Sequence, residues 1–156
     1  MLAQRVLVVD HGVVVESGPT AEVLRHPRTA FTARIAGLNL VTGVAEERGV
    51  RHGNGQLVEG LAPTPLVPGD PAIAVFAPSA VSVFSRPPHG SPRNTIEVTV
   101  TELEPRDDQI RVWAVTDRGA IFAADVTAPA VSELELLPGR TVYFSVKASA
   151  VSVYPR

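Results

Sequence analysis

Two stretches of this sequence are nearly copies of each other, and they decide the fold. The first is Ile73-Ala-Val-Phe-Ala-Pro-Ser-Ala-Val-Ser-Val-Phe84, and the second is Tyr143-Phe-Ser-Val-Lys-Ala-Ser-Ala-Val-Ser-Val-Tyr154. Each residue of the second stretch lies 70 positions after its counterpart, and a Pro-Gly pair precedes both stretches. The pentapeptide Ser-Ala-Val-Ser-Val is identical in the two. A repeat of this kind predicts two copies of one small structural unit.

Both copies open with an asparagine followed by a run of apolar residues, at Asn39 and at Asn94. In the second run Ile96, Val98 and Val100 alternate with polar residues, as in a strand with one buried face. Short strands leave unpaired edges unless their sheet closes, so we predict a mainly β fold with two small five-stranded OB-like barrels. The predicted strands are 41–46, 56–59, 72–76, 81–84, 95–103, 109–116, 121–126, 142–147 and 151–154.

The N-terminal region has a different pattern. Two β-branched runs, 5–10 and 12–16, flank the turn Asp10-His11-Gly12 and predict a hairpin. Thr20 is the expected N-cap of a short helix, and a second short helix is expected to end near Gly37. The exposed Val and Leu side chains of such a hairpin would favour aggregation, so we expect it to pair with a partner strand or pack on the barrels.

The Pro-rich stretch 86–92 is too rich in proline to be a strand and separates the two copies. We therefore divide the chain into an N-terminal segment and two β-units, at residues 1–37, 38–86 and 87–156. The boundaries follow from the change of pattern after Gly37 and from this Pro-rich linker.

Composition excludes several classes of function. The 14 Lys and Arg against 16 Asp and Glu, with 5% aromatic residues, argue against nucleic-acid binding. No cysteine is present, so thiol catalysis and thiolate metal sites are excluded, and the four histidines show no metal-ligand spacing. No apolar run reaches the roughly 18 residues that span a bilayer, and no signal-peptide pattern is found. These features predict a cytoplasmic protein without membrane insertion.

Two parts of the chain resemble known families. Residues 3–39, with Gly18-Pro-Thr-Ala-Glu22, resemble the C-terminal end of an ABC transporter ATP-binding domain. Ser91-Pro-Arg-Asn94 resembles the Ser-Ala-Arg-Asn signature of molybdate-binding Mop domains, and Val146-Lys-Ala-Ser-Ala-Val151 resembles their closing Val-Lys-Ser-Thr-Asp-Val segment. Together the chain is similar to the last part of the ATP-binding subunit of a molybdate importer, with a duplicated Mop/TOBE regulatory domain.

The resemblance implies a function and a site. The chain would be a homodimeric regulatory domain that binds cytosolic molybdate or tungstate and inhibits import by feedback, at the inner face of the membrane. Its parent complex would contact the membrane subunit through the ATPase domain. By residue-to-residue correspondence the oxyanion ligands would be Ser91, Arg93, Asn94, Lys147, Ala148 and Ser149. Lys147 is the only lysine of the chain.

Other interpretations remain open at this stage. The chain has no glycine-rich phosphate loop with lysine and no other motif of ATP hydrolysis, so we expect no enzymatic activity from it. It could be a purely structural dimerisation module, since Pro92 and Ala148 depart from the Mop motifs, or the regulatory domain of an importer of another substrate. In the first copy Leu38 and Ala77 replace the two basic residues, which predicts a weak site at most. Trp113 is expected in the core rather than in a stacking site.

Overall fold

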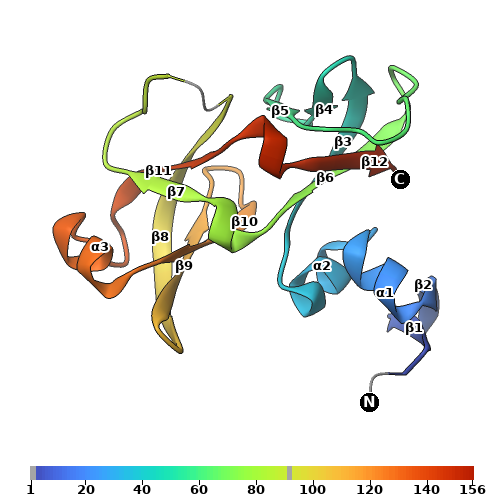
Figure 1. Cartoon of the computed structure of the whole chain (residues 1–156), viewed down its shortest axis with the longest axis horizontal. Helices are drawn as coiled ribbons and strands as arrows, with labels where there is room; N and C mark the ends of the chain where they lie inside the picture. The colour runs from blue at the N-terminus through green and yellow to red at the C-terminus, as the bar shows by residue number, and fades with distance from the viewer. Residues whose placement is uncertain (1–2, 91–92) are drawn as a thin grey trace.

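The computed structural model describes residues 3–90 and 93–156, and its N-terminal part is the predicted hairpin (Figure 1). Strand β1 (Arg5–Asp10) pairs antiparallel with β2 (Val13–Pro19). His11 and Gly12 form the turn, with φ values of 50° and 77°. A two-residue turn with positive φ at both positions matches the twist of the paired strands, and glycine adopts it without steric cost.

Two short helices follow, as predicted. Helix α1 (Thr20–Arg25) begins at Thr20 itself, so this residue is not the N-cap; its hydroxyl donates to the Ala3 carbonyl oxygen instead. Helix α2 (Ala30–Ala36) is capped by Thr29, whose side chain accepts a hydrogen bond from the Thr32 N–H at 3.2 Å. Gly37 ends α2 in the left-handed conformation, with φ of 72°.

Each repeat contributes to a five-stranded sheet. The first sheet has the order β12-β6-β3-β4-β5 and the second has the order β10-β9-β8-β11-β7. All neighbouring strands within the two sheets are antiparallel. The strands are β3 (Asn39–Glu46), β4 (Gly49–Arg51), β5 (Leu57–Glu59), β6 (Pro71–Phe76), β7 (Ser82–Phe84), β8 (Asn94–Arg106), β9 (Gln109–Val115), β10 (Ile121–Val126), β11 (Thr141–Val146) and β12 (Ser152–Pro155).

The last strand of each repeat joins the sheet of the other repeat. Strand β7, from the first copy, pairs with β11, and β12, from the second copy, pairs with β6. Figure 1 shows β12 running from the second sheet across to the first. Both sheets therefore draw strands from both copies. The boundary drawn at residues 86 and 87 stays a prediction about the sequence repeat, because neither sheet is completed by its own copy.

A shared core holds the two sheets together. Phe76 of the first sheet stacks on Phe122 of the second, with ring centroids 6.0 Å apart. Burial of apolar area is the main stabilising term in such a core, at about 25 cal/mol per Å². One continuous cluster contains buried apolar residues from both sheets and from the segments that connect their strands: Val41, Ala45, Val50, Val58, Ala72, Ala74, Phe76, Val81, Ile96, Val98, Val100, Val112, Ala114, Phe122, Ala124, Leu136, Val142, Phe144, Val146, Val151 and Val153.

The predicted fold class is confirmed: a mainly β chain with two five-stranded units after a hairpin and two helices. Sequence reasoning missed β4, which has only three residues, and helix α3 (Ala128–Glu133). Signals for α3 are present, because Thr127 caps it by accepting from the Ala130 N–H at 3.3 Å and Pro129 lies in its first turn. Two 3-10 turns, η1 (Pro78–Ala80) and η2 (Ala148–Ala150), also went unpredicted.

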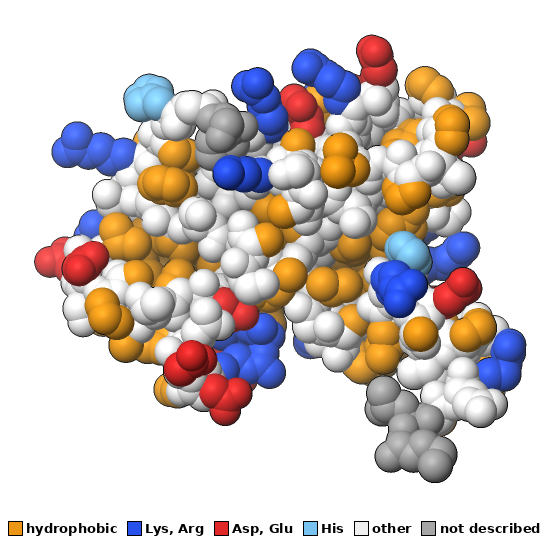
Figure 2. All heavy atoms as spheres, in the orientation of Figure 1, with side chains coloured by type: hydrophobic (Ala, Val, Ile, Leu, Met, Phe, Trp, Pro, Cys, Tyr) orange, Lys and Arg blue, Asp and Glu red, His pale blue; other side chains and the backbone are white. Residues whose placement is uncertain are grey.

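The hairpin leaves many apolar side chains in solvent. Its principal contacts with other elements are with α1 rather than with the barrels, and the other expected arrangement, pairing with a strand of a partner chain, stays a prediction. Leu7, Val13 and Val14 have 68%, 63% and 53% of their surface exposed, and orange side chains are visible over this part of the molecule in Figure 2.

Among the described residues, no helix has the length and apolar character needed to cross a lipid bilayer.

Candidate anion-binding site

The structure brings the two Mop-like segments together at one end of the second sheet. Strands β8 and β11 are antiparallel neighbours, and Asn94 and Val146 are Cα partners at the end of their ladder. Arg93 immediately precedes Asn94 and Lys147 immediately follows Val146, so the two basic residues leave the ladder side by side. Both are exposed. Ser91 lies outside the described residues.

Lys147 is the N-cap of the 3-10 turn η2, which carries the predicted ligands Ala148 and Ser149. The Ala150 N–H donates to the Lys147 carbonyl oxygen at 2.9 Å, and the Val151 N–H donates to that of Ala148 at 3.1 Å. Ala148 is half-buried and Ser149 is exposed. Ala148 can offer an anion only its backbone N–H, whereas Ser149 can also offer a hydroxyl. The turn thus presents one cation and one hydroxyl next to Arg93.

The side chain of Asn94 forms hydrogen bonds with the backbone of the first sheet. Its amide oxygen accepts a hydrogen bond from the Glu59 N–H at 2.7 Å, and its amide nitrogen donates to the Glu59 carbonyl oxygen at 2.9 Å. The residue is 1% exposed. Its side chain therefore ties β8 of the second sheet to β5 of the first, and its contribution as an anion ligand stays a prediction.

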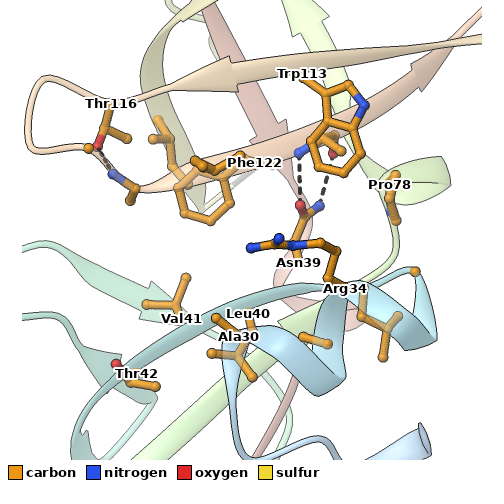
Figure 3. Close-up of a pocket in the computed structure, with 18 of the residues that line it drawn as sticks. Ala30, Arg34, Asn39, Leu40, Val41, Thr42, Pro78, Trp113, Thr116 and Phe122 are labelled. Atoms are coloured by element: carbon orange, nitrogen blue, oxygen red, sulfur yellow. Dashed lines mark hydrogen bonds between the residues drawn. The ribbon is translucent and has the colours of Figure 1, made fainter. Parts of the chain in front are cut away.

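In the first copy the equivalent asparagine, Asn39, makes the same kind of contact from the first sheet to the second. Asn39, at the start of β3, accepts from the Ala123 N–H at 2.8 Å and donates to the Ala123 carbonyl oxygen at 2.9 Å. Figure 3 shows both bonds as dashed lines. We call Asn39 and Asn94 the asparagine clamps. They give a structural reason for the repeated asparagine, which the sequence analysis described as the start of a strand in both copies and, for Asn94, also as an anion ligand.

The corresponding end of the first sheet lacks basic residues. Asn39 and Phe76 are Cα partners there, and Leu38 and Ala77 occupy the places of Arg93 and Lys147. Pro78 then takes the place of Ala148 and has no backbone N–H to donate. Without a cation at either of these two positions and without this amide donor, the first copy does not repeat the candidate site.

Sequence reasoning also missed Ser145, two residues before Lys147 on β11. Its side chain is 2% exposed, and among residues 3–90 and 93–156 its hydroxyl has no hydrogen-bond partner. Alternation along β11 puts Ser145 on the face opposite the core residues Phe144 and Val146. A buried hydroxyl without a partner carries a free-energy cost of about 1–3 kcal/mol, which makes it a polar group worth testing beside the candidate site.

A wide cleft lies elsewhere in the described part of the chain. It has a volume of about 880 Å³ and lies between α2, β3 and the β9–β10 hairpin. Figure 3 shows Arg34 reaching from α2 toward Trp113 and Phe122 on the opposite wall. Trp113 is half-buried and lines this cleft, whereas we expected it in the core. Its indole N–H donates a hydrogen bond to the Glu104 carboxylate at 2.9 Å.

One of the cations that line the cleft, Arg111, is paired with a carboxylate. Arg111 forms two hydrogen bonds with Asp125, at 2.8 and 3.0 Å, and this hydrogen bonding raises the pKa of the guanidinium. In the described part of the chain, no three His, Asp or Glu side chains are grouped so as to hold a metal ion. These features favour structural roles for the paired charges.

Comparison with known proteins confirms the resemblance seen in the sequence. Residues 90–153 match the TOBE domain family. The chain is 44% identical over 157 aligned residues to the molybdenum import ATP-binding protein ModC of Mycobacterium tuberculosis, covering 99% of this chain and 42% of that protein. It is 32% identical over 126 residues to the sulfate/thiosulfate import ATP-binding protein CysA 2 of Agrobacterium fabrum, covering 80% of this chain and 34% of that protein.

A solved structure has the same fold. The cytoplasmic molybdate-binding protein ModG superposes with a TM-score of 0.68 and 22% identity, covering 76% of this chain and 96% of ModG. The C-terminal part of the chain thus matches the TOBE family, and nearly the whole chain is similar to part of an importer ATP-binding protein. The chain spans less than half the length of the ATP-binding proteins that it matches.

Proposed function

We propose that the chain is the oxyanion-binding regulatory and dimerisation part of an ABC importer ATP-binding subunit, and that its ligand is molybdate or tungstate. The observation that carries the proposal is the juxtaposition of Arg93 and Lys147 at the end of the β8–β11 ladder. They are 54 positions apart in the sequence and have counterparts without charge in the first copy. ModC, its 44% identical relative, is a molybdenum import protein.

The chemistry of the site suits a tetrahedral dianion. Two cations would balance a charge of two, and hydroxyl or amide donors from Ser91 and residues 147–149 would set the size of the cavity. Arg93 and Lys147 are both exposed, so a single copy presents an open site. We propose that a second copy closes it, which makes the anion a link between subunits. In the parent complex, at the inner face of the membrane, such a link would favour one arrangement of the ATPase halves and so regulate import.

The proposal gives this chain no hydrolytic step of its own, because hydrolysis would belong to the parent's ATPase domain. A second candidate function is regulation of a sulfate importer, which the similarity to CysA 2 favours. A purely structural dimerisation module is the third. The three differ in one measurable property, the anion that the folded chain binds.

Isothermal titration of the chain with molybdate, tungstate, sulfate and phosphate tests the proposal, with sedimentation on the same samples. We expect molybdate and tungstate to bind with a micromolar or lower Kd. Lys147→Ala should raise the Kd of both anions at least tenfold. Arg106→Ala is the matched control, because Arg106 is an exposed cation at the opposite end of β8 from Asn94. Preferential sulfate binding would favour the second function, and no binding by a folded dimer would favour the third.

A further inference from the structure

Strand β12 connects the candidate anion site directly to the N-terminal segment. It begins two residues after η2, which carries Ala148 and Ser149, and it ends beside the loop between α1 and α2. Tyr154 lies five positions after Ser149, at most about 16 Å of chain at 3.3 Å per residue. In Figure 1, β12 ends on the same side of the molecule as α1 and α2.

Tyr154 makes the contact at the far end of β12. Its hydroxyl donates to the Pro27 carbonyl oxygen at 2.5 Å, and its ring meets the His26 ring edge-on, with centroids 5.0 Å apart. Burial, followed by the nearby Glu16 carboxylate, raises the pKa of Tyr154 well above its ordinary value. The hydroxyl therefore remains a donor at physiological pH.

The loop that Tyr154 touches is itself firmly anchored. Glu16 of β2 is 7% exposed and accepts the Arg28 N–H at 2.6 Å and the Thr29 hydroxyl at 2.9 Å. The Thr32 hydroxyl of α2 also donates to Glu16. A displacement of the Pro27 carbonyl would therefore be passed to both the hairpin and α2.

The strand between the two contacts is rigid. The Leu61 N–H donates to the Val151 carbonyl oxygen at 2.9 Å, and the Val153 N–H donates to that of Leu61 at 2.9 Å. Val151 and Val153 are 1% and 0% exposed. A Cβ at Gly60 would lie 2.7 Å from the Val153 side chain, so the backbone there packs directly against β12. A strand held in this way moves as one piece.

From this chain of contacts we propose that β12 transmits anion binding at η2 to the N-terminal segment, with Tyr154 as the coupling residue. The proposal rests on the proposed function, since it adds the route by which the site would act on the ATPase end of the chain. Coupling of this kind is reciprocal, so a change at Tyr154 must also change anion affinity. The exchange of last strands makes the route possible, because β12 would otherwise stay in the second sheet.

Hydrogen exchange of the full chain with and without molybdate tests the coupling. We expect molybdate to slow exchange in residues 20–36 several-fold, and Tyr154→Phe to remove this change while the chain stays folded. Phe84 occupies the equivalent position of the first copy, so phenylalanine suits such a strand. Tyr143→Phe is the control, because it removes a similar hydroxyl, bonded to Glu97 at 3.2 Å, from the second sheet and should leave the change intact.

The outcomes separate the two proposals. Molybdate binding without slower exchange in residues 20–36, or an undiminished effect in Tyr154→Phe, would overturn the coupling and leave the proposed function standing. No calorimetric binding of molybdate or tungstate by the folded wild-type chain would overturn the proposed function and the coupling with it. We expect Tyr154→Phe to change molybdate Kd by about fivefold, the lower end of typical allosteric coupling.

Discussion

The asparagine clamp at Asn94 gives a quantitative prediction about stability. Asn94→Ala removes two hydrogen bonds to Glu59, of 2.7 and 2.9 Å, from a side chain that is 1% exposed. Each of the two buried bonds contributes about 1 kcal/mol, and leaving its partner unpaired raises the loss to about 2 kcal/mol per bond. We expect the free energy of unfolding to fall by about 2–4 kcal/mol. In a chain of this size that corresponds to a fall in Tm of roughly 5–15 °C.

Urea unfolding followed by circular dichroism measures the loss, and Asn54→Ala is the matched control. Asn54 accepts only one hydrogen bond, from the Gln56 N–H at 2.9 Å in its own loop, so its replacement should cost about 1 kcal/mol or less. Asn39→Ala should cost as much as Asn94→Ala, because it breaks the symmetric clamp. An Asn94→Ala variant no less stable than Asn54→Ala would refute the clamp.

Three further predictions concern single sites. The pKa of Tyr154 is raised from 10.0, so above pH 10 the tyrosine keeps its proton in the folded state and loses it in the unfolded state. The free energy of unfolding should therefore fall above pH 10, by at most about 1.4 kcal/mol per pH unit. Urea unfolding at several pH values should show a smaller fall for Tyr154→Phe. Gly49→Ala should unfold the chain or lower Tm sharply, because the added Cβ would lie 2.0 Å from the Val58 carbonyl oxygen. Gly53→Ala is the control: its added Cβ has no atom within 4 Å, so Tm should stay nearly unchanged. Arg111→Ala should lower the free energy of unfolding by about 1–3 kcal/mol, since it leaves the 12% exposed Asp125 without its partner; an unchanged urea midpoint would contradict this.

Much of the fold follows from local patterns. Alternation at Ile96, Val98 and Val100 predicts a strand because side chains point to opposite faces of a sheet at every step. The turn at His11 and Gly12 predicts the hairpin because the backbone conformation it needs suits glycine. Elements without such a signal were missed, such as the three-residue strand β4.

The candidate site was predicted in part. Similarity to Mop motifs selected Arg93 and Lys147, and the register of β8 and β11 puts them at one end of the sheet. The same motif selected Asn94 as a ligand, but its side chain is used by the clamp to Glu59. Ser145 was not found, because a serine in a strand carries no signal of its burial or of its missing partner.

The sequence by itself determined the duplication, the strands and the pair of basic residues in the second copy. Only the tertiary structure decided which sheet each last strand joins. The two copies end in the identical Ser-Ala-Val-Ser-Val, so either strand could fit either sheet edge on local grounds. The clamps likewise join residues 35 and 84 positions apart. Such pairings depend on the packing of the whole core, and no local pattern encodes them.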